Sequence, residues 1–334
     1  ILLISSVVTF LIVLIFGSEI SRYTAIPLNW LFVILISCFF QFVFLIPLTI
    51  WQVKLRPMQY GAFQILQTLA NLGISLVLVI ALKYGWKGRI LGQVASMAVF
   101  SVFAIFILLK NKWINFKFDK ELFISALRFG VPLIPHTIGA VIIMLTDRLL
   151  LNNMVGLKQT GIYMVAFQCA SVLNLGTTAL NSAYVPWLYS KLKLNDEAIK
   201  RKIVKSTYLY FILLIIVTSS IIIIAPYLFP IVVGDKFIGA SSYFSIIILG
   251  FMFNGFYLMV TNYLFYAEKT EVLGLSTIFL TIVNLPLSYF LIKYYDAVGA
   301  AYGFVIVSFL TFISTFYFSQ KYYKMPWFKT ELNT

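Results

Sequence analysis

The side chains of this chain that could do chemistry lie inside long apolar runs. Asp147 and Arg148 are the only acid and base well within such a run, and His136, the single histidine, lies three helical turns earlier. The imidazole and the carboxylate would therefore share one helix face, about 16 Å apart and too far for direct pairing. An ionisable group in hydrocarbon costs several kcal/mol, so this face, with Ala140 and Ile143, is expected to line a wet substrate cavity.

Each of these residues has a second interpretation. Asp147 could instead hold helices together through a polar contact with Arg148 or with a neighbouring helix, and His136 could lie at the membrane interface. Arg148 is turned by about 100° from Asp147 around the helix, so it either lines the cavity or extends outward to water. The sequence leaves these alternatives open.

Uncharged polar residues recur at helical spacing in further apolar runs, which predicts either hydrogen bonds between helices or a polar lumen that accepts carbohydrate. Eight amide side chains are candidates for lining the substrate cavity: Gln64, Gln67, Asn71, Gln168, Asn174, Asn181, Asn254 and Asn284. Ser171, Thr178, Tyr257, Thr261, Thr277, Thr281 and Ser288 continue the same stripes.

About ten transmembrane helices, in an all-α bundle, are expected to position these groups. Apolar residues make up 61% of the chain and charged residues 11%, against roughly 45–50% and 25% in soluble domains. A helix needs roughly 20 apolar residues to cross a bilayer, because lipid offers no partners for backbone groups. The predicted spans are residues 1–16, 29–50, 60–82, 90–109, 131–151, 161–185, 206–227, 241–265, 272–292 and 297–318.

The basic residues predict the orientation of these spans. Most Lys and Arg side chains fall in one set of alternate loops, which includes residues 110–128 and 190–205, and such loops stay in the cytoplasm. With an even number of spans, both termini are then cytoplasmic. The basic loop 110–128 is the expected boundary between two helical lobes, 1–115 with four spans and 116–334 with six. The chain starts inside an apolar run without Met, so it is expected to be truncated at its N-terminus.

Several classes of function are not expected. The net charge of +14 would suit a nucleic-acid partner, but the bases lie in loops between apolar runs rather than on one folded face. No G-x-x-x-x-G-K-[ST] loop is present, so direct use of ATP is not expected. One histidine and two cysteines inside apolar runs, Cys38 and Cys169, predict no metal site and no cofactor. Asp119 and Glu121 could imitate an acidic metal-binding motif, but they fit a capped helix start better.

Residues 128–188 resemble the polysaccharide biosynthesis flippases, the Wzx-type exporters of O-antigen and capsule repeat units. The resemblance is carried by Phe129-Gly130 with Pro132, the Asp147-Arg148 pair, Gly161-Ile162-Tyr163, Pro186, and the sequence VGAAYG from Val298 to Gly303. It implies a transporter, not an enzyme, of the multidrug/oligosaccharidyl-lipid/polysaccharide exporter superfamily, with two six-helix lobes across a central cavity. The division into four and six spans then implies that the first two helices of the first lobe are missing. Cationic residues of that lobe, which help to hold pyrophosphate or sugar in the family, would be missing with them.

The resemblance also implies what is transported. The substrate would be an undecaprenyl-pyrophosphate-linked oligosaccharide, flipped across the bacterial cytoplasmic (inner) membrane by alternating access for O-antigen or capsule synthesis. Membrane lipid and a polysaccharide polymerase are the implied partners. A coupling ion, H⁺ or Na⁺, is left open.

Three alternatives remain from the sequence. A multidrug or cation antiporter of the same superfamily would need several buried carboxylates to bind a cation, whereas Asp147 is nearly the only acid within the predicted spans. A membrane polysaccharide polymerase or glycosyltransferase usually carries a large outer loop or an acidic soluble segment, and the outer loops here are short. A membrane scaffold without transport activity is the third.

Overall fold

The chain folds into two compact helical units. A computed structural model describes residues 2–24, 26–114, 119–233 and 239–327, and within these ranges it contains helices and turns but no strand. Unit 1 is Ile1–Phe123 and unit 2 is Ile124–Thr334. The predicted all-α bundle of membrane helices is confirmed, while the predicted lobe boundary between residues 115 and 116 lies outside the described residues.

Unit 1 consists of helices that pack around an aromatic core. It contains α1 (Leu2–Thr24), α2 (Leu28–Val53), α3 (Pro57–Leu76), the short π-helix η1 (Val77–Ala81), α4 (Gly85–Lys110) and the start of α5 (Lys120–Gly130). Phe44, Phe63 and Phe100 meet in its core. Asp119 Oδ1 accepts hydrogen bonds from the backbone N–H groups of Glu121, at 2.9 Å, and Leu122, at 3.0 Å. The predicted helix cap at Asp119 is therefore confirmed, and part of the predicted loop 110–128 is helical.

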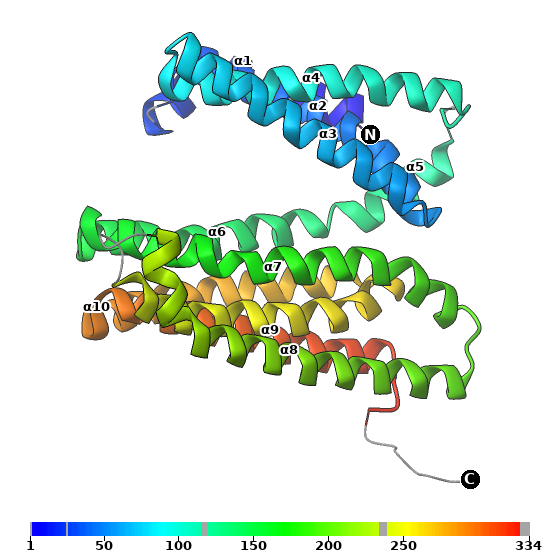
Figure 1. The fold of residues 1–334 in the computed structure, drawn as a ribbon. Coiled ribbons are helices and arrows are strands. Elements are labelled where there is room, and N and C mark those ends of the chain that lie inside the picture. Colours follow the sequence, from blue (N-terminus) through cyan, green and yellow to red (C-terminus); the bar gives the residue numbers. More distant parts are fainter. Residues whose placement is uncertain (1, 25, 115–118, 234–238, 328–334) are drawn as a thin grey trace. The chain divides into compact units, whose positions relative to one another are not determined.

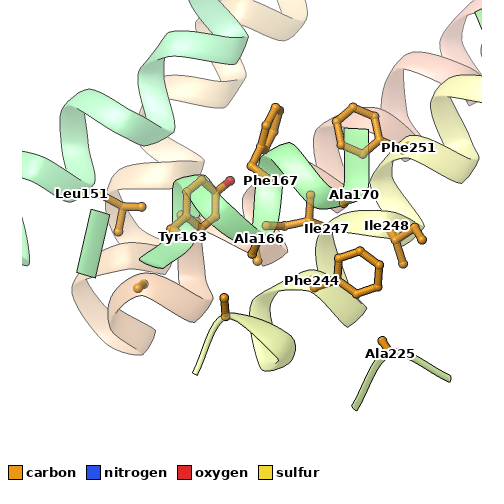
Figure 2. Packing of buried hydrophobic residues seen from close by; sticks show 14 of the residues in the cluster. Leu151, Tyr163, Ala166, Phe167, Ala170, Ala225, Phe244, Ile247, Ile248 and Phe251 are labelled. Atoms are coloured by element: carbon orange, nitrogen blue, oxygen red, sulfur yellow. The ribbon is translucent and has the colours of Figure 1, made fainter. Parts of the chain in front are cut away.

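Unit 2 is a bundle of longer helices. It contains α6 (Leu133–Met154), α7 (Leu157–Leu192), α8 (Glu197–Val233), α9 (Ala240–Tyr266) and α10 (Thr270–Tyr322). α9 packs most extensively against α10 and α7, and α6 packs along α10 (Figure 1). Small and large residues interlock between α7 and α9: Figure 2 shows Ala166 and Ala170 beside Ile247 and Phe244.

The 53-residue helix α10 is a hairpin of two helices. Its backbone leaves the helical conformation at Asp296, where φ is 52° and ψ is −138°. Beyond this point the chain returns along itself, because Ser314 Oγ lies 2.6 Å from Ser276 Oγ and Gly303 packs beside Ser288. The predicted separation of spans 272–292 and 297–318 corresponds to the two arms of this hairpin.

The number and length of the membrane helices follow from these elements. In the described part of the chain, nine helices are long and apolar enough to cross a membrane, with α10 counted once. Since α10 is a hairpin, the ten predicted spans are all present. Several helices extend beyond the predicted ends: α1 continues to Thr24, and α7 and α8 leave only residues 193–196 of the predicted loop 190–205. Hydropathy detects the lipid-facing length of a helix, whereas backbone hydrogen bonding continues through its polar ends.

Candidate functional site

Unit 2 contains a cavity of about 400 Å³ between α6, α7, α9 and α10. Its lining combines hydrogen-bonding groups, one charged group and aromatic rings. The residues are His136, Ala140, Ile143, Met144 and Arg148 of α6, Phe167, Gln168, Ser171 and Asn174 of α7, Phe251, Asn254 and Tyr257 of α9, and Thr277, Phe304, Val307, Ser308 and Thr311 of α10. All four helices thus contribute polar side chains to one space.

Two hydroxyl groups fix the imidazole of His136 in the cavity wall. Thr277 Oγ1, from α10, lies 2.6 Å from His136 Nδ1. The Tyr257 hydroxyl, from α9, lies 3.3 Å from His136 Nε2. Both ring nitrogens therefore have partners on other helices, and His136 joins three helices while one side of it lines the cavity.

Arg148 is the one charged side chain in the cavity lining. Its guanidinium carbon lies 5.1 Å from the centre of the Phe167 ring, which is a cation–π contact. In the described ranges no carboxylate forms an ion pair with it, and its Nε is buried without a hydrogen-bond partner. A guanidinium donates hydrogen bonds in a planar fork that matches carboxylate and phosphate groups. Arg148 can therefore receive an anionic ligand.

Three phenylalanine rings form the apolar wall of the cavity. The centres of the Phe167, Phe251 and Phe304 rings lie between 5.1 and 5.3 Å from one another. Figure 2 shows Phe167 and Phe251 in a cluster of buried hydrophobic residues. These rings were not predicted from the sequence, because the chain contains 32 phenylalanines and an apolar side chain suits lipid as well as protein.

Asp147 lies beside the cavity rather than in its lining. Its side chain is only 3% exposed, and the Ser288 hydroxyl, from α10, lies 2.8 Å from Asp147 Oδ1. Ser288 Oγ is also 3.1 Å from Asn284 Oδ1. Asn284 is buried, and its Nδ2 has no hydrogen-bond partner among the described residues. Asp147 and Asn284 thus belong to a polar contact between α6 and α10, because Asp147 points toward α10 while Arg148 turns toward α7.

We expect a measurable coupling between Asp147 and Ser288. A hydrogen bond between transmembrane helices contributes about 0.6 kcal/mol on average and up to about 1.7 kcal/mol. The unfolding free energies of Asp147→Asn, Ser288→Ala and the double variant, measured in detergent, should give a coupling energy in this range. Asp147→Asn combined with Ser276→Ala is the control and should be additive. Additivity in both cycles would contradict the contact.

The other predicted residues separate into different surroundings. Gln168, Asn174 and Asn254 line the cavity of unit 2. Asn181 lies further along α7, where its Oδ1 accepts a 2.8 Å hydrogen bond from Asn262 Nδ2.

The three predicted residues of unit 1 lie on α3. Gln67 is buried, and its Nε2 lies 3.4 Å from Ser96 Oγ of α4. Asn71 accepts a hydrogen bond from Arg89, and Gln64 is half-buried. In the described ranges no group of three His, Cys, Asp or Glu side chains could hold a metal ion.

Comparison with protein families gives two matches. The family described as "Polysaccharide biosynthesis protein" matches residues 1–193, and the family described as "Putative exopolysaccharide Exporter (EPS-E)" matches residues 188–328. The "Lsg locus putative protein 1" of Haemophilus influenzae is 26% identical over 296 residues, which cover 85% of this chain and 73% of that protein. An "Uncharacterized membrane protein" of the same organism is 26% identical, and the match covers 76% of this chain and 64% of that protein.

Comparison with solved structures shows the same fold in transporters. A MATE protein in complex with MaL6 superimposes with a TM-score of 0.79 at 16% identity, covering 96% of this chain and 77% of that one. A MOP superfamily transporter from Pyrococcus furiosus superimposes with a TM-score of 0.77, also at 16% identity, covering 96% and 76%. At such low identity these structures establish the fold alone.

Proposed function

Because the chain belongs to the polysaccharide biosynthesis protein family, we propose that it flips undecaprenyl-pyrophosphate-linked oligosaccharides from the cytoplasmic to the outer leaflet of the bacterial inner membrane. It is a multi-pass membrane protein, and its family and fold are those of a transporter rather than of an enzyme. The product would serve O-antigen or capsule synthesis, and movement would follow alternating access.

The observation that carries this proposal is the cavity of unit 2, which places polar groups among lipid-length helices. A sugar loses its hydrogen bonds to water when it enters hydrocarbon, at a cost of several kcal/mol for each group left unpaired. Amides from Gln168, Asn174 and Asn254 and hydroxyls from Ser171 and Thr311 offer replacements. The three phenylalanine rings offer an apolar surface for the C–H faces of a sugar ring.

Arg148 supports an anionic substrate. The pyrophosphate linkage of the proposed substrate carries negative charge, as do acidic sugars, and a guanidinium without an ion pair can bind either group. A cavity with a buried carboxylate would have favoured a cationic drug instead. Asp147, next to Arg148 in the chain, does not line the cavity and accepts a hydrogen bond from Ser288.

The remaining parts of the proposal concern placement and partners. The excess of Lys and Arg in one set of alternate loops supports cytoplasmic termini. The polyprenyl tail would stay in the lipid while the saccharide crosses. H⁺ or Na⁺ is the proposed coupling ion, and a polysaccharide polymerase that uses the flipped unit is the proposed partner.

Deletion of the gene tests the function. We expect loss of surface polysaccharide, together with accumulation of undecaprenyl-linked oligosaccharide inside the cell. Both should be restored by the wild-type gene. The measurements are staining of surface glycan and mass spectrometry of extracted lipid-linked intermediates. Normal surface glycan with a changed sensitivity to cationic drugs would overturn the proposal and favour the multidrug or cation antiporter.

A further inference from the structure

His136 and Arg148 are the first and the last residues that α6 contributes to the lining of the cavity in unit 2. They are twelve residues apart, which corresponds to about 18 Å along the helix. The α6 residues that line the cavity between them, Ala140, Ile143 and Met144, are apolar. Arg148 is therefore the permanent charge on this side of the cavity, and His136 is the second group there that becomes charged near neutral pH.

The contacts of His136 determine which ring nitrogen carries the hydrogen in the neutral imidazole. Thr277 Oγ1 lies 2.6 Å from His136 Nδ1. The ring also bonds the backbone of Leu273, which lies one helical turn before Thr277 and therefore on the same side of the ring. A backbone carbonyl only accepts hydrogen bonds, so Nδ1 is the nitrogen that donates. Nε2 is left as the basic nitrogen.

The surroundings of Nε2 suit both charge states of the imidazole. Its neighbour is the Tyr257 hydroxyl at 3.3 Å, slightly beyond the usual range of about 2.7–3.2 Å for a hydrogen bond. A hydroxyl group can donate to a neutral Nε2 and can accept from a protonated one, because its hydrogen rotates. His136 is half-buried and lines the cavity, so a protonated Nε2 can also donate to a ligand there.

No acid faces this imidazole from the described helices around it. In the cavity lining, α7 contributes phenyl, amide and hydroxyl groups, α9 contributes Tyr257 as its titratable group, and α10 contributes none. On α6 itself, Asp147 is turned toward α10. At the start of α10, Glu271 Oε1 lies 3.9 Å from Lys269 Nζ, and both side chains are exposed. A protonated imidazole would therefore lack a counter-ion in the lining, and Arg148 would add a like charge.

An anion in the cavity reverses this balance. In its absence, the like charge of Arg148 favours the neutral imidazole, and in its presence the opposite charge favours the protonated form. The anion thus promotes protonation of His136, and protonation strengthens binding of the anion. These two effects are equal by thermodynamic linkage.

The charge of the proposed substrate matches two cationic groups rather than one. A pyrophosphate that joins a lipid to a saccharide is a diester with two negative charges, whereas the guanidinium of Arg148 supplies one positive charge. A charge that is buried without a partner is strongly unfavourable. A protonated His136 supplies the second positive charge.

We propose that the cavity of unit 2 takes up one proton on His136 when it binds a ligand with two negative charges. The proton comes from water and binds to Nε2, and the N–H group that forms donates to the anion. The identity of the ligand rests on the proposed function. Affinity rises as pH falls through the range in which His136 is neutral in the free protein and protonated in the complex, and it is constant outside this range.

Two synthetic probes that differ only in their linkage test this proposal. Farnesyl-diphospho-N-acetylglucosamine is a pyrophosphate diester whose charge is constant near neutral pH, and farnesyl N-acetylglucosaminide is neutral. Binding to the whole chain is measured by thermophoresis in phosphatidylcholine nanodiscs between about pH 6 and about pH 8. We expect affinity for the diester to rise up to about tenfold for each unit of falling pH, and affinity for the neutral probe to stay constant.

His136→Gln keeps hydrogen-bonding groups at this position but cannot be protonated. We expect this variant to bind the diester without pH dependence, and with the affinity that the wild type has at about pH 8. Tyr257→Phe is the matched control, because it removes the hydroxyl beside Nε2 and leaves the imidazole, so its pH dependence should remain. A pH dependence that persists in His136→Gln would overturn the proposal.

The wild-type chain also allows a direct measurement, since His136 is the single histidine of this sequence. Histidine that is isotope-labelled at Cε1 gives one imidazole signal in NMR spectra if the affinity tag contains no histidine. At about pH 7, the diester should move this signal toward that of the protonated ring, and the neutral probe should not. A diester that binds equally at every pH and leaves the signal unchanged would overturn this inference alone, whereas one that binds at no pH would contradict the proposed function as well.

Discussion

Arg148→Met should lower transport of the lipid-linked saccharide at least about tenfold and leave the amount of protein in the membrane unchanged. The methionine keeps a long apolar side chain against Phe167, so packing is retained while the charge is lost. A hydrogen bond to a charged group contributes about 1.5–3 kcal/mol, and each 1.4 kcal/mol changes an equilibrium constant tenfold. The measurement is rescue of surface glycan in the deletion strain, normalised to membrane abundance.

Two further variants sharpen the Arg148 experiment. Arg148→Lys keeps the charge but loses the planar fork, so we expect partial rescue. Arg201→Gln, an exposed site on α8, removes an arginine outside the cavity and should rescue fully. Full rescue by Arg148→Met would contradict a role for this charge in substrate binding, and reduced abundance would show a structural role instead.

Gly299→Ala should destabilise unit 2 by about 3 kcal/mol, the upper end of the cost of overpacking a core. A Cβ at this position would collide with the backbone carbonyl of Leu291 and the backbone nitrogen of Ile292 in the facing arm of α10. The arms cannot separate easily, because the turn at Asp296 joins them three residues away and Ser276 bonds Ser314 further along. We expect a clear fall in the midpoint of thermal unfolding in detergent and in membrane abundance.

Gly73→Ala is the matched control for Gly299→Ala. No atom lies within 4 Å of a Cβ at Gly73, so alanine adds helix propensity, about 1 kcal/mol, without a collision. The two Gly→Ala changes should therefore shift the unfolding midpoint in opposite directions. A similar midpoint for both variants would show that the arms of α10 lie further apart than this structure has them.

Helix faces were more predictable from the sequence than the partners of those faces. The spacing of Thr277, Thr281, Asn284 and Ser288 predicted one polar face, and all four side chains are buried together. The same kind of spacing in α7 predicted one stripe, but Gln168 and Asn174 line the cavity whereas Asn181 bonds Asn262 elsewhere. Periodicity places side chains around one helix axis and carries no information about which helix lies opposite.

The two interpretations of the Asp147-Arg148 pair could not be separated from the sequence. Adjacent residues on a helix point about 100° apart, so one of the two had to face a different neighbour. The packing of α6 between α7 and α10 turns Arg148 to the cavity and Asp147 to Ser288. The three phenylalanine rings of the cavity wall could not be identified from the sequence either, since phenylalanine is compatible with lipid and with a protein interior alike.

The sequence by itself determined the class of the protein and the course of its helices. Lipid offers no hydrogen bonds to the backbone, so each apolar run of sufficient length had to form a helix. Asp119, which precedes α5, was predicted to cap that helix and does so. The tertiary structure alone decided which polar groups meet: it closed α10 into a hairpin, and it brought His136, Arg148 and Asn254 to one cavity. These contacts depend on how helices pack against one another, which the pattern along a single helix does not specify.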